Sequence, residues 1–290
     1  MSDKKKGILC IVASSFCFAL MNVFIRLSGD IPSIEKTFFR NFIAMFVAAF
    51  AIARAGEGFS FRRQDLPLLT WRSICGTLGM LCNFYAVDHM LLADATAIQK
   101  LVPFFTILSS WLILKERIKS WQVALIIAAF LSSLLVVKPG FSPDIIPALI
   151  QFLGAVGAGI AYTLVRKLTL QGVAKPKIIF FFSAFSCIVV IPFIALDFVM
   201  PDLYQLCMLL LTGLAASGGQ FAITYAYGYA PARQISIYDY SQILFAAVFG
   251  LVFFAQVPDW LSWAGYILLA GCAILNFALS NRPAKKSETI

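Results

Sequence analysis

Charged residues and histidine are scarce in this chain. Only 13% of its 290 residues are charged, and His89 is the single histidine. Soluble globular proteins carry about 25% charged residues, so the composition excludes an ordinary soluble domain. The sequence also contains no GxxxxGK[ST] phosphate-binding loop, no HExxH zinc motif and no Ser/His/Asp set. We therefore expect a protein that is not an enzyme and that holds neither a cofactor nor a metal.

The seven cysteines lie within apolar segments, and no two of them form a CxxC pair. This spacing argues against a disulfide framework and against a zinc site. The cysteines are predicted to be small packing residues of helices.

Long hydrophobic runs, in contrast, are abundant: 61% of the residues are hydrophobic. A membrane-spanning helix needs about 20 mostly apolar residues. Charge, proline and glycine divide the chain into ten such segments and leave no room for a soluble domain. The predicted spans are residues 7–28, 37–53, 66–87, 92–114, 120–137, 146–165, 177–196, 203–228, 233–254 and 260–280. The fold class is thus all-α integral membrane.

The net charge of +9 is distributed over short loops rather than on one face. With the N-terminus in the cytoplasm, most basic residues fall in inside loops, while the outside loops carry Lys36, Lys138 and mostly acidic residues. Cytoplasmic loops of membrane proteins are enriched in Lys and Arg. The pattern predicts a multi-pass protein of the inner (plasma) membrane, with the lipid bilayer and not nucleic acid as its surroundings. Both termini and the 166–177 loop are predicted to be cytoplasmic.

Two segments occupy corresponding places in the two halves of the chain. Residues 93–117 and 230–258 each form the fourth span of a five-span half, and an odd number of spans gives the halves opposite orientations. We predict two inverted five-helix repeats. The first covers residues 1–170, including span six and its loop, and the second covers residues 146–290. Such repeats are typical of transporters that bind substrate at the repeat interface.

The residues of these segments carry a family resemblance. Residues 84–140 resemble the EamA half-repeat of the drug/metabolite transporter superfamily, and residues 226–271 resemble its second copy. Phe38-Phe39-Arg40 and Arg72-Ser-Ile-Cys-Gly76 also match the family pattern. The resemblance implies ten helices, a central cavity open alternately to each side, and transport of a metabolite. One departure is Gln256, where the second repeat often carries an acid.

Lys100 and Asp239 are the sharpest candidates for substrate binding. Lys100 lies inside the fourth span, where a charge costs about 2.5–3.5 kcal/mol, so it should face a cavity or a partner. Asp239 lies in the ninth span, and repeat symmetry predicts that the two approach each other. A lysine that reaches the membrane surface through its long side chain, or an ion pair that merely locks the halves together, are the alternatives.

Further polar and aromatic side chains are predicted to line the same site, although tyrosines also anchor helices at membrane surfaces. They are Tyr238, Gln242, Tyr85, Gln99, Tyr225 and Asn22; Tyr240 is a related candidate. Arg26 and Arg40 are expected to pair with Glu35 or Asp30 in a structural role. Arg72 is expected to be an anchor at the inner membrane surface.

These observations predict a secondary active transporter that moves a small polar metabolite by alternating access. Lys100 favours a ligand with a carboxylate or phosphate, and Asp239 favours an amine or a transported proton. A zwitterion such as an amino acid, a nucleoside-like compound and an organic anion fit both residues. A non-transporting scaffold or lipid-interacting protein, an integral-membrane enzyme and a channel are the alternatives. The sequence leaves open whether the protein is a monomer or a homodimer.

Overall fold

A computed structural model describes residues 3–115, 120–137, 145–196, 198–229 and 236–280. Within these ranges the regular structure is helical throughout. The elements are α1 (Asp3–Leu27), α2 (Ser33–Arg54), α3 (Leu66–His89), α4 (Leu92–Gln99), α5 (Val102–Leu114), α6 (Ser120–Val137), α7 (Ile145–Leu170), α8 (Lys175–Leu196), α9 (Leu203–Tyr229), the 3-10 helix η1 (Ser236–Tyr240), α11 (Ser241–Phe254) and α12 (Trp260–Ser280).

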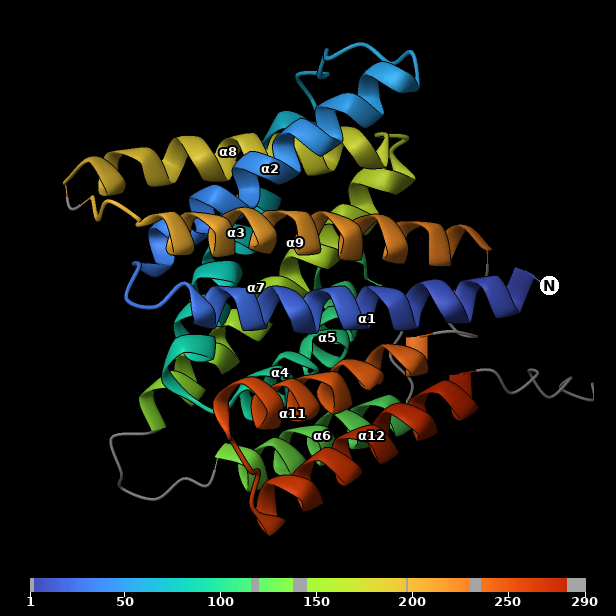
Figure 1. Cartoon of the computed structure of the whole chain (residues 1–290). Helices are drawn as coiled ribbons and strands as arrows, with labels where there is room; N and C mark the ends of the chain where they lie inside the picture. Colours follow the sequence, from blue (N-terminus) through green and yellow to red (C-terminus); the bar gives the residue numbers. More distant parts are fainter. Residues whose placement is uncertain (1–2, 116–119, 138–144, 197, 230–235, 281–290) are drawn as a thin grey trace, which may run out of the picture.

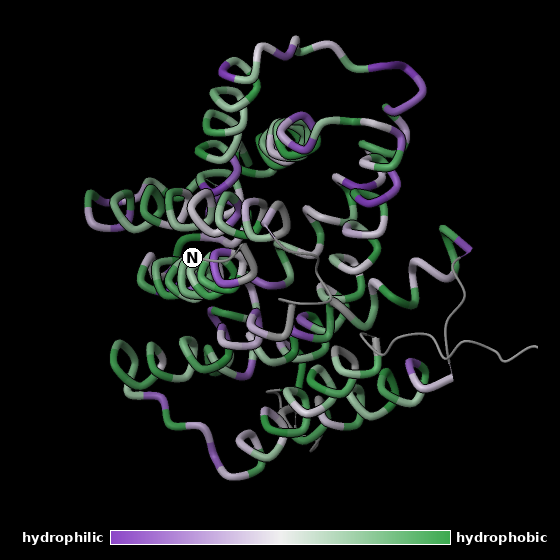
Figure 2. Tube along the Cα trace, turned by 90° about the vertical axis from the view of Figure 1, so that its right-hand side faces the viewer, coloured by the Kyte–Doolittle hydropathy of each residue, from purple (hydrophilic) through white to green (hydrophobic). Residues whose placement is uncertain are grey.

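The helices occupy the places of the predicted spans, with two differences. The fourth span is divided into α4 and α5, and the described part of the ninth span consists of η1 followed by α11. Among the described residues, six helical stretches are long and apolar enough to cross a membrane. Those within 120–132, 238–254 and 260–275 are apolar but shorter. Hydrophobic residues follow the helices, and hydrophilic residues gather mainly in the connections (Figure 2).

The packing of the helices repeats itself between the two halves. Helix α1 packs along α9, and its counterpart α7 packs along α3, the counterpart of α9. Helix α2 packs against its own counterpart α8, as α6 does against α12 (Figure 1). The first residue of α1 and the last of α12 lie at the same end of the bundle (Figure 1). The two halves therefore interlock through equivalent contacts, as two copies of one repeat would.

Helices α5 and α11 end in the same unusual backbone conformation. Lys115 follows α5 with φ of 54°, and Ala255 follows α11 with φ of 52°. This left-handed region is unfavourable for residues other than glycine. Gln256, the second residue after α11, accepts a hydrogen bond through its side-chain oxygen from the Leu92 backbone N–H at the start of α4 (3.1 Å). An amide here can thus satisfy a free N–H group of a helix N-terminus.

Helices α3 and α7 approach each other closely because glycine lies on both sides. A Cβ atom at Gly79 would lie 2.9 Å from the Gly154 carbonyl oxygen, and one at Gly154 would lie 2.6 Å from Cys82 Cβ. Both distances are shorter than the contacts that real Cβ atoms make with non-bonded neighbours. Small residues permit such backbone contact between membrane helices, and here they fix the distance between the two halves.

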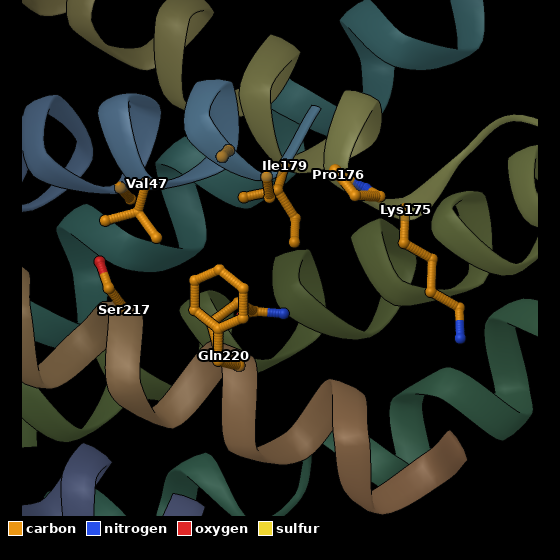
Figure 3. A pocket seen from close by; sticks show the side chains of 10 residues that line it. Val47, Lys175, Pro176, Ile179, Ser217 and Gln220 are labelled. Atoms are coloured by element: carbon orange, nitrogen blue, oxygen red, sulfur yellow. The ribbon is translucent and has the colours of Figure 1, made fainter. Parts of the chain in front are cut away.

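A lateral groove lies between α2, α8 and α9 (Figure 3). Val47, Pro176, Ile179 and Ser217 contribute to its walls, and Lys175 lies at its edge. None of the residues predicted to bind substrate lines it. The groove is thus a feature of the helix packing and is separate from the charged residues described next.

Candidate functional site

Lys100 lies at the break between α4 and α5. Its backbone N–H donates to the carbonyls of both Thr96 and Ala97 (3.1 Å each), which tightens the last turn of α4. A proline at the second position of α5 cannot continue the hydrogen-bond ladder of a preceding helix. The chain therefore turns at Lys100 and Leu101, and the charged side chain leaves the helix at this turn.

Asp239 lies at the corresponding place in the second half, within η1 and directly before α11. Lys100 Nζ donates to Asp239 Oδ2 at 2.6 Å, and the two form a salt bridge. The Lys100 side chain is 7% exposed and that of Asp239 is 23% exposed. The structure thus brings together the two charges predicted to meet, at the break between α4 and α5 in the first half and in the 3-10 helix before α11 in the second.

Two further side chains hold this pair. Ser15 Oγ of α1 lies 3.2 Å from Asp239 Oδ1 and 3.2 Å from its backbone carbonyl, and it can donate to either. The Tyr240 hydroxyl donates to the Lys100 carbonyl (3.1 Å). Sequence reasoning missed Ser15. The signal was present, because Ser14 and Ser15 are adjacent polar residues in an apolar helix, and such residues form bonds between membrane helices.

An amide cluster lies beside the turn. The Gln151 side-chain NH₂ group of α7 lies within hydrogen-bond distance of three acceptors: Gln99 Oε1 (2.7 Å), Asn83 Oδ1 (3.0 Å) and the Ala95 carbonyl (3.1 Å). Gln151 is fully buried and its Oε1 has no hydrogen-bond partner. The cluster fixes the end of α4 against α3 and α7. Gln151 was also missed by the sequence analysis.

The other predicted site residues form no hydrogen bond or ion pair with the Lys100 and Asp239 side chains in the described part of the chain. Tyr85 stacks on His89 with 4.1 Å between ring centroids, and Tyr225 is 60% exposed. Tyr238 is exposed although it precedes Asp239, whereas Gln242 is buried in α11. Asn22 is buried in α1, and its Oδ1 has no hydrogen-bond partner. Their role in substrate binding stays a prediction.

The arginines lie beside an aromatic ring. Arg72 is in the first third of α3, its guanidinium carbon lies 3.8 Å from the centroid of the Phe182 ring, and within the described ranges its buried Nε and Nη1 have no hydrogen-bond partner. Arg40 lies 5.9 Å from the same centroid and donates to Asn41 Oδ1 (2.8 Å). Among the described residues, no ion pair joins either arginine to a carboxylate.

The free-energy cost of placing Arg40 and Arg72 inside the bundle is not balanced by their contacts with Phe182 and Asn41. A cation inside a membrane protein costs about 2.5–3.5 kcal/mol on insertion scales. A cation–π contact returns about 0.5–2 kcal/mol, and here one ring serves two guanidinium groups. Expensive charges inside a membrane are commonly functional.

A separate charged network lies near the ends of α2 and α3. Lys36 Nζ donates to Asp88 Oδ2 at 2.6 Å, and the Lys36 side chain is fully buried. Arg26 donates to the Met90 carbonyl (2.8 Å) rather than pairing with Asp30. Glu35 accepts from the Val199 backbone N–H (2.9 Å). These contacts connect helices to loops and suit the structural role expected for Arg26.

The comparisons with known proteins agree with this geometry. The profile of the EamA-like transporter family matches residues 5–138 and again 145–278. The chain is 35% identical over 273 residues to the pseudopaline exporter CntI of Pseudomonas aeruginosa, covering 93% of this chain and 95% of that protein. It is 24% identical to the riboflavin transporter of Brucella anthropi, over 91% and 95% of the two chains.

A eukaryotic relative and a solved structure extend the likeness. Solute carrier family 35 member G1 of Mus musculus is 26% identical, over 89% of this chain and 74% of that protein. A crystal structure with 18% identity superposes with a TM-score of 0.67, over 95% of this chain and 99% of the other, and shows the same fold. The relatives are transporters rather than enzymes. With two matches of the family profile that together span most of its length, this chain belongs to the EamA-like transporter family.

Proposed function

We propose that this protein is a secondary active transporter of the inner membrane, built from ten membrane-spanning helices in two inverted five-helix repeats. The equivalent contacts of α1 with α9 and of α7 with α3 support two interlocked repeats. The basic loops support cytoplasmic termini, and the shared end of the bundle for α1 and α12 agrees with an even number of spans (Figure 1). The domain limits near residues 170 and 146 belong to this proposal. Rocking of one repeat against the other provides alternating access.

The observation that carries the proposal is the Lys100–Asp239 ion pair. Lys100 lies where the fourth span is broken and Asp239 lies in the 3-10 helix directly before α11, and interrupted helices form the substrate and ion sites of many transporters. The two charges come from opposite halves, so the distance between them changes when the halves move. A substrate with a carboxylate and an amine can replace each partner of the pair with a charge of its own. The pair is thereby a contact that binding breaks.

The substrate is a small polar metabolite of the amino-acid, nucleoside-like or organic-anion class. Ser15 and Tyr240 add a hydroxyl on each side of the ion pair. Asp239 is the residue that carries a proton if transport is coupled to one, because carboxylates within membrane spans serve as proton relays. The names of the relatives provide two first probes, pseudopaline and riboflavin.

Counterflow in proteoliposomes tests this function. Vesicles that contain the purified protein are loaded with unlabelled pseudopaline, riboflavin or one of a panel of amino acids, and uptake of the same labelled compound is measured. We expect saturable counterflow for at least one compound. Lys100→Ala and Asp239→Ala should reduce it strongly, whereas Lys175→Ala, which removes a cation away from the pair, should not.

Each alternative gives a distinct result. A channel gives flux that rises linearly with concentration and shows no counterflow. A scaffold gives no flux above that of empty vesicles. Full counterflow by Lys100→Ala protein would leave transport in place but remove the ion pair from the mechanism.

A further inference from the structure

Two guanidinium groups from neighbouring helices converge on one buried aromatic ring. Arg40 of α2 and Arg72 of α3 lie 5.9 and 3.8 Å from the centroid of Phe182, which belongs to α8. Gly76, one turn after Arg72, makes room for the ring, because a Cβ atom there would lie 3.0 Å from Phe182 Cε2. The stacking is thus built into the sequence of α3 and is not an accident of a long side chain.

The charges of this arrangement are unbalanced. The two guanidinium groups repel each other, and the ion pairs of the described residues include neither of them. Arg72 Nε and Nη1 are buried donors without an acceptor in the described part of the chain. Arg40 has a neutral acceptor, Asn41 Oδ1, which holds it in place without cancelling its charge. Buried donors without acceptors and like charges in proximity are both unfavourable until an anion joins them.

The position of the pair inside the bundle restricts the source of that anion. Arg40 lies about 10 Å along α2 from its first residue, and Arg72 about 9 Å along α3 from its own. Phe182, on which both converge, is 6% exposed. A lipid phosphate at the membrane surface is therefore a poorer fit than a small anion that enters between the helices.

Tyr162 of α7 connects this pair to the Lys100–Asp239 pair. It lies near enough to Arg40, Arg72 and Asp239 for their charges to act on its hydroxyl, and the residue is 52% exposed. A residue that lies near groups on three other elements and keeps half of its surface accessible fits a route by which one ligand approaches both charged groups.

We infer that Arg40 and Arg72 form a carboxylate-binding subsite for the transported substrate. The planar forks of arginine match the two oxygens of a carboxylate. This inference rests on the proposed transport function and deepens it. The substrate carries a carboxylate for the arginine pair in addition to the groups that meet Lys100 and Asp239, so it is a di- or polycarboxylate or an amino-acid derivative with more than one acid group.

Equilibrium binding to the protein in nanodiscs tests the subsite without requiring transport. The probes are succinate, citrate and L-glutamate, each compared with its methyl esters. We expect at least one free acid to bind saturably and its fully esterified form to bind at least tenfold more weakly. Arg40→Gln and Arg72→Gln should each weaken binding of the free acid at least tenfold, and Arg72→Lys should weaken it less. Arg54→Gln, a matched change at the exposed end of α2, should leave it unchanged.

Thermal stability separates a binding role from a structural one. If an arginine stabilises the fold, its replacement should lower the unfolding temperature of the protein. Replacement of an uncompensated charge should instead leave the unfolding temperature of ligand-free Arg72→Gln protein unchanged or raised, as is common for residues that serve function at the expense of stability. A lowered temperature for both Gln variants, with binding of the acids unchanged, would refute the subsite.

The remaining outcomes are equally decisive. The absence of binding by every acid overturns the inference, as does equal binding of acids and esters. Loss of acid binding when phosphatidylglycerol replaces phosphatidylcholine in the nanodiscs would assign the arginines to a lipid headgroup. Acid binding that depends on the arginines in a protein without counterflow would support the subsite and refute transport. Counterflow by a protein whose acid binding is insensitive to both substitutions would support transport and refute the subsite.

Discussion

The Lys100–Asp239 pair allows a quantitative test by a double-mutant cycle. Removal of one partner from a buried ion pair costs about 3–5 kcal/mol, because the other charge is left uncompensated. The two partners differ in this respect. Without Asp239, the 7% exposed Lys100 ammonium has no ion-pair or hydrogen-bond partner among the described residues, whereas Asp239 without Lys100 keeps Ser15 and is 23% exposed. Asp239→Ala should therefore destabilise more than Lys100→Ala.

The expected values follow from these exposures. We expect a loss of about 4 kcal/mol for Asp239→Ala and about 3 kcal/mol for Lys100→Ala, both near the middle or lower end of the range for broken buried pairs. The double variant contains no unpaired charge at this place and should lose only about 4 kcal/mol. The difference corresponds to a coupling energy of about 3 kcal/mol, the upper part of the range for residues in direct contact.

The measurement is equilibrium unfolding of the four proteins in mixed micelles of a mild detergent and dodecyl sulfate. Ser132→Ala, a change of a buried hydroxyl that bonds within its own helix, provides a control for general effects of substitution in the bundle. Additive losses, with a double variant near 7 kcal/mol, would show that the two charges do not stabilise each other. The reasoning from the 2.6 Å contact would then fail.

Three further predictions concern coupling, topology and packing. Asp239→Asn should abolish uptake driven by a pH gradient and retain substrate exchange if Asp239 carries the proton, and equal loss of both in flux assays would contradict that role. A cysteine introduced at Lys175 should not react with an impermeant maleimide added to intact cells, and reaction from outside would reverse the proposed orientation. Gly79→Ala should lower the stability by about 1–3 kcal/mol, because its Cβ would lie 2.9 Å from the Gly154 carbonyl oxygen. Gly271→Ala, where nothing lies within 4 Å of the new Cβ, should be neutral or slightly stabilising in the same unfolding assay.

The sequence predicted the positions of the helices because hydrophobic length is a local property. The limits of α2, α8 and α9 agree with the predicted spans to within a few residues. The turn at Lys100 also had a local signal in the proline that follows it. The 3-10 turn of η1 did not, because Ser236–Tyr240 contains neither glycine nor proline. The 3-10 helix instead forms contacts with distant elements, including the hydrogen bond from Ser15 to Asp239.

Site residues that carry a charge within an apolar segment could be predicted from the sequence. Residues whose role depends on which side of a helix faces the other half could not. Lys100 and Asp239 were predicted as site residues because a charge in an apolar segment is costly and commonly functional. Gln151 and Tyr162 belong to helix α7, which is apolar over most of its circumference, so the sequence does not indicate which side faces the other half. The contact of Arg72 with an aromatic ring was unpredictable for a related reason. Its environment is set by the Phe182 ring of α8, a residue more than a hundred positions away.

The interaction energies expected at the Lys100–Asp239 pair and at the Arg40–Arg72 pair indicate why one protein needs both pairs. Shifting a two-state equilibrium from 1:99 to 99:1 requires about 5.5 kcal/mol of differential binding. For an ion pair that is intact in one state and broken in the other, a coupling of about 3 kcal/mol changes the equilibrium by a factor of about 150 at most, which leaves the shift incomplete. The missing part requires a second contact that differs between the two states. The Arg40–Arg72 pair is suited to this, because its charges lie on α2 and α3 while the shared ring belongs to α8 in the other half. A ligand that engages only the ion pair should therefore populate both states, and a ligand whose carboxylate also reaches the arginines should complete the transition.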